Sequence, residues 1–348
     1  MNPYILATLL FSLGLGTTTT FISSHWLLAW MGLEINTLAI LPLMAQHHHP
    51  RAVEATTKYF LTQAAAAAML LFASMTNAWL TGQWDIQQMS HPLPITIIMF
   101  ALALKMGLAP MHSWLPDVLQ GLDLTTGLIL STWQKLAPFI VLLQMQPTNP
   151  AVLILLGLAS TLVGGWGGLN QTQLRKILAY SSIAHLGWMA LVIQFFPSLA
   201  ILTLLMYFIM TSSTFLVFKL NKSTNVNSLA TSWTKNPALT SLTPFILLSL
   251  GGLPPLSGFM PKWLILQELT KQDLALLATL AALTALLSLY FYLRLSYAMT
   301  LTMFPNTLTA TISWRFPYSQ LSLPLAISTT ATISLLPLTP AAASLLAS

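Results

Sequence analysis

The sequence has no cysteine and very little charge. Its 348 residues include 13 basic and 7 acidic side chains, so charged residues make up 6% of the chain. A soluble domain carries roughly 25% charged residues, which excludes a soluble enzyme, a disordered protein and a nucleic-acid-binding protein. Without cysteine there is no disulfide, thiolate metal site or iron–sulfur centre.

Apolar residues fill the chain instead. They make up 55% of it, and the mean hydropathy is +0.75. The runs are continuous, as in residues 64–71, and lack the period of two that a barrel strand requires. Because a helical span needs about 20 apolar residues, we predict an all-α, polytopic membrane protein. We expect about eleven spans, at 3–22, 26–45, 60–80, 93–120, 125–145, 151–169, 177–196, 199–218, 238–270, 274–297 and 322–343.

Two of these segments, 93–120 and 238–270, are too long for one span and contain internal proline and glycine. They are the fourth and the ninth, so their positions differ by five, an odd number, and their orientations should be opposite. Broken helices in corresponding places of two inverted halves are typical of transporters. The alternative is that proline and glycine are simply common in membrane helices.

The placement of lysine and arginine predicts an orientation. Alternate loops put most of the basic residues on one side and only Lys271 on the other. This bias predicts that the N-terminus lies on the inner side and the C-terminus on the outer side. The longest loops, about 219–237 and 298–321, leave no room for an extramembrane domain, so the function should lie within the bilayer. The residues on the inner side are Arg51, Lys58, Arg175, Lys176, Lys219, Lys222, Lys235, Arg294 and Arg315.

Four charged residues fall in or near the predicted spans: Glu34, Lys105, Lys135 and Lys262. A charge at the bilayer centre costs about 2.5–3.5 kcal/mol on insertion scales, so each is a candidate functional residue. Lys135 lies near the middle of its span, and Lys105 and Lys262 each lie beside a helix break. The alternative is a structural role, in which Glu34 pairs with Asn36 or with a lysine.

The chemistry of these residues suits protons. Burial disfavours the charged form of both lysine and glutamate, and contact between them restores it. Forming and breaking such a pair can therefore gate proton uptake and release, and no carboxylate cage for Na⁺ or Ca²⁺ accompanies it. His185, in the seventh span, is either a proton relay between Lys135 and Lys262 or a core histidine.

Five segments resemble the antiporter-like membrane subunits of mitochondrial respiratory complex I, in the form found in vertebrates such as fish. The resemblance covers about residues 1–300, and no specific motif is visible in 301–348. Chains of this type are similar to multi-subunit cation/proton antiporters. The segments are 30–36, 58–64, 111–118, 174–185 and 251–259.

The resemblance implies a single membrane domain with two inverted five-helix repeats, at 1–146 and 147–300, and a loop and C-terminal helix at 301–348. It implies that Glu34, Lys105, Lys135 and Lys262 carry the proton path, with His185 as a weaker relay. It places the chain in the mitochondrial inner membrane, with the N-terminus in the matrix and the C-terminus in the intermembrane space. Other membrane-arm and accessory subunits would be partners, and lipids such as cardiolipin can bind.

The resemblance also implies which groups this chain binds and which bind to other subunits of the enzyme. NADH, FMN, the iron–sulfur clusters and ubiquinone would belong to other subunits, and this chain would bind no cofactor or metal. It would translocate protons as part of an NADH:ubiquinone reductase. The alternative function is a standalone cation/proton antiporter. A third possibility is a structural membrane scaffold, but the buried charges argue against it, because they are costly and a scaffold would gain nothing from them.

Overall fold

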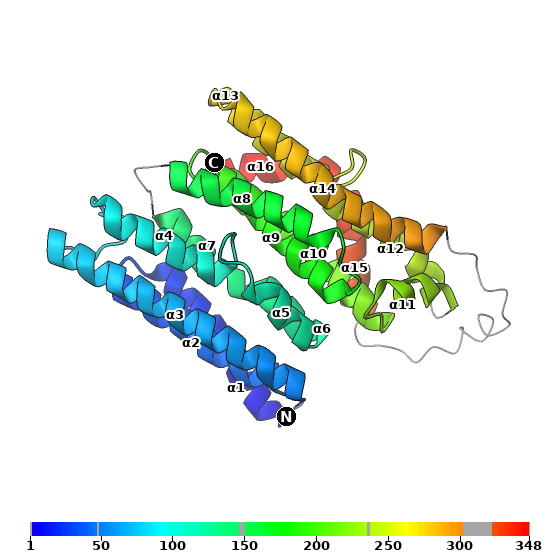
Figure 1. Cartoon of the computed structure of the whole chain (residues 1–348), viewed down its shortest axis with the longest axis horizontal. Coiled ribbons are helices and arrows are strands. Elements are labelled where there is room, and N and C mark those ends of the chain that lie inside the picture. The colour runs from blue at the N-terminus through cyan, green and yellow to red at the C-terminus, as the bar shows by residue number, and fades with distance from the viewer. Residues whose placement is uncertain (1, 47–48, 146–149, 235–236, 302–321, 348) are drawn as a thin grey trace. The chain divides into compact units, whose positions relative to one another are not determined.

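The computed structural model describes residues 2–46, 49–145, 150–234, 237–301 and 322–347. These residues form helices and two isolated β-bridges but no sheet (Figure 1). The expected all-α class is therefore confirmed. In chain order the helices are α1 (Pro3–Ile22), α2 (Trp26–Met44), α3 (Pro50–Thr81), α4 (Pro92–Met106), α5 (Trp114–Gly121), α6 (Leu124–Ser131), α7 (Trp133–Gln144), α8 (Ala151–Gly168), α9 (Leu174–Val192), α10 (Pro197–Leu220), α11 (Val226–Ala230), η1 (Thr231–Thr234), α12 (Pro237–Gly251), α13 (Phe259–Lys271), α14 (Ala275–Thr300), α15 (Ser322–Ser334), η3 (Leu336–Leu338) and α16 (Thr339–Ala347).

Seven segments in the described part of the chain are long and apolar enough to cross a membrane, with α6 and α7 taken together as one of them, or eight if a bent C-terminal pair also counts as one span. The two halves that precede the predicted breaks, α4 and α12, are shorter apolar helices. The chain is therefore a polytopic membrane protein, and the number of eleven spans stays a prediction.

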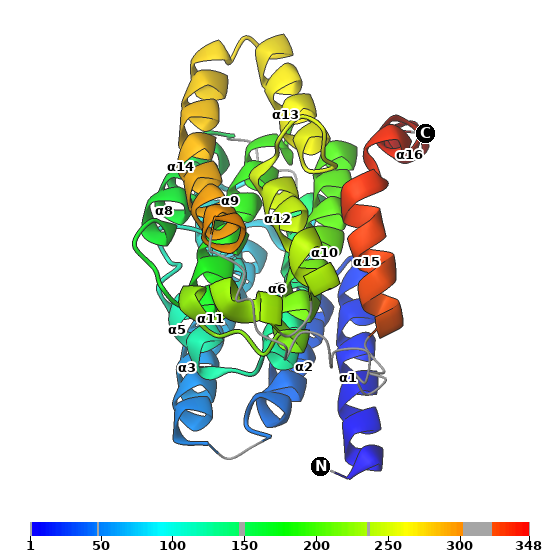
Figure 2. The ribbon, with the colours of Figure 1, turned by 90° about the vertical axis from the view of Figure 1, so that its right-hand side faces the viewer.

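The helices gather into two compact units, Met1–Ser160 and Thr161–Ser348. In the first unit α2 packs between α1 and α3, and α7 contacts α1, α2 and α4. In the second unit α10 contacts α9, α12, α13 and α15, and α14 packs on α12 and α13. Figure 2 shows α13 and α14 as a hairpin joined by a short turn.

Glycine lets α1 and α2 cross at backbone contact. A Cβ atom placed on Gly16 would lie 2.9 Å from the carbonyl oxygen of Gly32, and one on Gly32 would lie 2.9 Å from that of Gly16. The Cβ on Gly16 would also overlap the side-chain oxygen of Asn36. Such close approach is typical of membrane helix pairs, and here it presses one side-chain amide of α2 against α1.

Both predicted helix breaks are present, and both start with the same cap. The first half-helices end at Gly107 and Gly252, whose φ angles of 81° and 80° lie in the left-handed region. The N–H of the next residue then turns back to a helix carbonyl, from Leu108 to Ala103 at 2.9 Å and from Leu253 to Leu248 at 3.3 Å. This pattern satisfies carbonyls that would otherwise be unpaired at a helix end.

The two breaks also agree residue by residue at a constant offset. Gly107 corresponds to Gly252, Pro110 to Pro255, Pro116 to Pro261 and Asp117 to Lys262. The preceding half-helices, α4 and α12, both have 15 residues. Each unit also contains one isolated β-bridge, between His25 and Asp85 in the first unit and between Gln173 and Asn225 in the second.

Helix α3 begins earlier than its predicted span. Its first residue is Pro50, ten residues before the predicted start at 60, because polar residues lower the hydropathy of its first turns without breaking the helix. The predicted span 125–145 is present as one candidate span, Leu124–Gln144, with a local interruption at Thr132 between α6 and α7. The hydroxyl of Thr132 donates to the carbonyl of Leu128 at 2.7 Å, and such back-bonding often bends a helix.

The C-terminal half also departs from a simple loop-and-span order. The predicted loop 219–237 contains α11 and η1, and the predicted loop 298–321 lies largely outside the described residues. The predicted span 322–343 is bent by 69° between α15 and the segment that follows (Figure 2). Pro337 lies at this bend, and proline lacks the N–H that would continue the helix.

Gly258 offers a steric test of the second break. Its φ of −71° suits any residue, but an added Cβ would overlap the carbonyl oxygen of Ser249 and lie 3.1 Å from the sulfur of Met210. We expect Gly258→Ala to destabilise the second unit by about 1–3 kcal/mol, as overpacking does. The measurement is the thermal midpoint and amount of the assembled complex that contains the chain.

Gly14→Ala is the matched control, because nothing lies within 4 Å of a Cβ at Gly14. It should leave both quantities unchanged or slightly higher, since alanine favours a helix over glycine. Equal effects of the two changes would contradict the packing that we describe at the break.

Candidate functional site

Lys105 and Lys135 face the same enclosed cavity in the first unit. Lys105 is 7% exposed and Lys135 is 3% exposed. The cavity has a volume of about 20 Å³, which gives room for about one water molecule. Two of the predicted site residues, which are 30 positions apart in sequence, therefore lie at one place in the fold.

The fold places Lys105 at the end of a half-helix. It lies in the last turn of α4, where the free carbonyl groups carry partial negative charge and favour a cation. The indole N–H of Trp114, across the break, donates to the carbonyl of Leu104 at 3.0 Å. Within the described part of the chain, the ammonium nitrogen of Lys105 is buried without a hydrogen-bond partner.

Glu34 lies on α2, and no ion pair within 4.0 Å joins it to Lys105 among the described residues. One carboxylate oxygen of Glu34 is buried without a hydrogen-bond partner there. The structure thus holds the two groups apart, and the switchable contact that the sequence suggested stays a prediction.

Lys262 and His185 come together in the second unit. Both line a small cavity of about 20 Å³. The ammonium group of Lys262 donates to the carbonyl of Gly251 at 2.8 Å, and the ring of His185 lies 5.5 Å from the ring of Tyr207, centre to centre. Lys262 also borders a larger groove of about 660 Å³ whose walls are mainly apolar.

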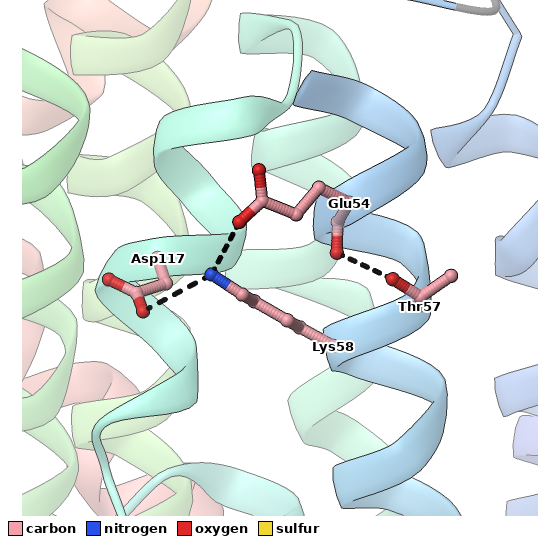
Figure 3. Close-up of polar contacts among 4 residues, drawn as sticks. All are labelled: Glu54, Thr57, Lys58 and Asp117. Atoms are coloured by element: carbon pink, nitrogen blue, oxygen red, sulfur yellow. Dashed lines mark hydrogen bonds and ion pairs between the residues drawn. The ribbon is translucent and has the colours of Figure 1, made fainter. Parts of the chain in front are cut away.

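Asp117 lies in an exposed polar cluster. Its carboxylate is 3.8 Å from the ammonium group of Lys58, which is 2.7 Å from Glu54 (Figure 3). The side chains of Lys58 and Asp117 are 46% and 53% exposed. Asp117 thus joins α3 to α5 at the surface. His112, nearby in sequence, makes a local contact of 3.2 Å with the carbonyl of Pro110.

Three amide side chains border the cavity of the first unit: Asn36, Gln63 and Gln134. Sequence reasoning considered Asn36 only as a partner for Glu34 and did not single out the two glutamines. A signal was available, because Gln63 interrupts an apolar run and Gln134 directly precedes Lys135. The side-chain N–H of Gln134 donates to the backbone carbonyl of Asn36 at 3.2 Å and so ties α7 to α2.

No group of three or more histidine, aspartate or glutamate side chains is arranged to hold a metal ion in the ranges that the structure describes. The candidate site residues are buried amines, one carboxylate and one imidazole. Such groups can take up and release protons.

Comparison with known proteins identifies the class first. Residues 23–288 match the family described as "NADH:quinone oxidoreductase/Mrp antiporter, TM". The solved structure of respiratory complex I from Thermus thermophilus with bound aureothin contains a similar chain, with a TM-score of 0.82 and 29% identity over 95% of this chain and 78% of that one. The Mrp complex from Dietzia shares the fold, with a TM-score of 0.80 at 17% identity over 97% of this chain and 77% of that one. The chain therefore has the fold of an antiporter-like membrane subunit.

The more specific assignment rests on relatives that match over nearly the whole length. NADH-ubiquinone oxidoreductase chain 2 from Tetraodon nigroviridis is 75% identical over 98% of both chains. The corresponding chain from Oncorhynchus mykiss is 71% identical over 100% of both. Residues 289–343 match the family "NADH dehydrogenase subunit 2 C-terminus", so the family match extends beyond the region, about residues 1–300, over which the motifs gave the resemblance. The chain belongs to the NADH-ubiquinone oxidoreductase chain 2 family.

The exposed cluster in Figure 3 yields a prediction for Asp117. We expect Asp117→Asn to leave the ratio of protons pumped to electrons transferred unchanged, because exposed ion pairs contribute little and Lys58 keeps Glu54 as a partner. The ratio can be measured in vesicles containing the intact complex. A clear fall in that ratio would place Asp117 in the proton path instead.

Proposed function

We propose that this chain moves protons through two buried clusters, Lys105 with Lys135 and Lys262 with His185, within mitochondrial respiratory complex I. The chain is a core membrane subunit of this enzyme, which couples electron transfer from NADH to ubiquinone to proton translocation. The observation that carries the proposed route is the cavity shared by Lys105 and Lys135.

Two amines facing one small cavity suit proton transfer. If both carried a charge, their repulsion in a medium of low dielectric constant would be large. The favoured arrangement therefore has one ammonium and one neutral amine. Glu34, on α2, carries the opposite charge, and a carboxylate brought close to Lys105 would favour its charged form. A change in the distance between Glu34 and Lys105 would then decide which lysine holds the proton.

The second cluster is suited to passing a proton onward. Lys262 borders both the small cavity shared with His185 and the larger groove. Its bond to the carbonyl of Gly251 fixes the amine between them. We propose that His185 exchanges protons with Lys262, and that Lys262 is the transfer point toward a neighbouring subunit or the outer face.

The family supports a proposal for where the chain lies. We propose that it lies in the mitochondrial inner membrane with its N-terminus in the matrix and its C-terminus in the intermembrane space, as the lysine and arginine pattern favours. Other membrane-arm and accessory subunits are its partners, and lipids such as cardiolipin bind its surface. NADH, FMN, the iron–sulfur clusters and ubiquinone bind to other subunits.

We also propose that residues 1–146 and 147–300 are two repeats, followed by a distinct C-terminal segment, 301–348. The support comes from the two breaks, where Gly107 and Gly252 carry the same cap and the prolines correspond in register. The boundary falls between α7 and α8, whereas the compact units divide within α8. A packing unit and a repeat need not end at the same residue.

Lys135→Met tests the proposed route directly. Methionine keeps the length and apolar stem of the side chain but cannot carry a proton, so we expect lower coupled turnover and fewer protons pumped per electron in the intact complex. Lys271→Met is the matched control, because Lys271 is 61% exposed and paired only with Glu268 among the described residues. Normal proton stoichiometry in the Lys135→Met complex would refute the route.

Lys262→Met separates a relay from a helix cap. If Lys262 only caps α12 through Gly251, its loss should reduce assembly and leave the proton stoichiometry of the assembled complex intact. If Lys262 relays protons, assembly should stay near normal and proton-coupled quinone reduction should fall. We expect the second result, and normal assembly with normal pumping would contradict both roles.

A further inference from the structure

Lys135 lies in a helical turn that is irregular on both sides. The interruption at Thr132 precedes it, where φ and ψ are −112° and −73°, and the backbone N–H of Lys135 donates to the carbonyl of Thr132 at 3.2 Å, three residues back instead of the four of an α-helix. Pro138 follows inside α7. Because proline has no N–H, it cannot donate to the carbonyl of Gln134. The helix ladder therefore places the turn 132–138 less firmly than its neighbours.

The side chain of Gln134 ties this turn to another helix. Its amide N–H donates to the backbone carbonyl of Asn36 in α2 at 3.2 Å, across 98 positions of sequence. A carbonyl oxygen only accepts, so the bond needs the amide nitrogen of the glutamine. On one side the bond reaches α2 two residues beyond Glu34, and on the other side it starts next to Lys135.

The far end of α7 has a bond of the same kind to a different helix. Gln144, the last residue of α7, donates its side-chain N–H to the backbone carbonyl of Phe21 in α1, also at 3.2 Å. Helix α1 contains no charged residue. The two glutamines thus make equal bonds, but only that of Gln134 connects two helices that carry candidate site residues.

The bond of Gln134 is not needed to bring the helices together. Helix α7 packs against α2 and α4 along its length. What the bond adds is a fixed relation between one carbonyl of α2 and the irregular turn of α7. Because Glu34 belongs to the same stretch of α2 as Asn36, the bond also fixes where Lys135 lies relative to the backbone of Glu34.

We propose that Gln134 is a positioning residue, which keeps Lys135 in register with the part of α2 that bears Glu34. This inference rests on the proposed function and concerns the placement of one of its lysines. When α2 shifts, the carbonyl of Asn36 draws Gln134, and with it the turn of Lys135, in the same direction. The amide takes up no proton and acts only through the position of its neighbour.

The test replaces Gln134 in the intact complex. Gln134→Met removes the N–H donor and keeps the length and unbranched shape of the side chain. Because misplacing a reacting group by about 1 Å can cost up to roughly 10²-fold in rate, we expect coupled turnover per assembled complex to fall roughly tenfold. The ratio of protons pumped to electrons transferred, measured in vesicles that contain the complex, should fall with it.

Gln144→Met is the matched control, because it makes the same exchange in the same helix and removes a bond of the same length. It should leave the proton-to-electron ratio unchanged. A purely structural role of Gln134 would lower the thermal midpoint or the amount of the complex and leave that ratio unchanged, which would overturn the proposal. Equal falls of the ratio in both variants would overturn it too, because the effect would not depend on the turn of Lys135.

Gln134→Asn is the second variant, and it also serves if Gln134→Met assembles poorly. It keeps the amide but is one methylene shorter, so its N–H falls short of the carbonyl of Asn36. We expect the ratio to fall as it does for methionine. A normal ratio would show that any polar side chain suffices and would refute the positioning role. So would a structure of the unaltered complex in which the amide of Gln134 does not meet that carbonyl.

These failures differ from failure of the proposed function. If Lys135→Met lowers pumping while Gln134→Met and Gln134→Asn do not, the lysine route stands and the positioning role of Gln134 is wrong. If Lys135→Met pumps normally, the route itself is wrong, whatever holds the turn in place.

Discussion

A helix that ends inside a membrane leaves carbonyl groups that the lipid cannot satisfy. The chain meets this constraint twice, at the ends of α4 and α12. In the first case Trp114 donates to Leu104, and Lys105 adds its charge from within the last turn. In the second case the lysine comes from the next half-helix and reaches back to Gly251. Both buried amines therefore lie where a broken helix presents its negative end.

This arrangement explains why the two lysines do not correspond in register. At the constant offset between the breaks, Lys262 corresponds to Asp117, and Lys105 corresponds to Leu250. Asp117 is directed to the exposed amine of Lys58, whereas Lys262 is directed to a buried carbonyl. The two helix breaks thus carry opposite charges at matching positions, and only the lysine is directed to a buried group.

Much of this could be predicted from the sequence because it depends on local patterns. Continuous apolar runs predict the helices, and proline with glycine predicts the two breaks. Charges in apolar spans predict the site candidates. The grouping of Lys105 with Lys135 could not be predicted in this way, since it depends on how α4 and α7 pack. The early start of α3 and the interruption at Thr132 were missed because hydropathy measures polarity, not helical continuity.

The glutamines were missed for a related reason. An amide carries no net charge, so Gln63 and Gln134 do not stand out in a search for costly ions, although an unpaired amide is also expensive in an apolar interior. Their importance becomes visible only when the packing shows that they border the same cavity as the lysines. In a membrane protein the neutral polar residues of the core therefore carry information that a charge inventory omits.

The glycine crossing of α1 and α2 extends this reasoning to a helix without any charged residue. Asn36 touches Gly16 so closely that a side chain at Gly16 would displace its amide oxygen. A single methyl group on α1 would thereby alter the geometry around the buried lysines without changing any ionisable group. An inherited substitution at this glycine would look conservative in chemical terms and would still act as a defect in energy conversion.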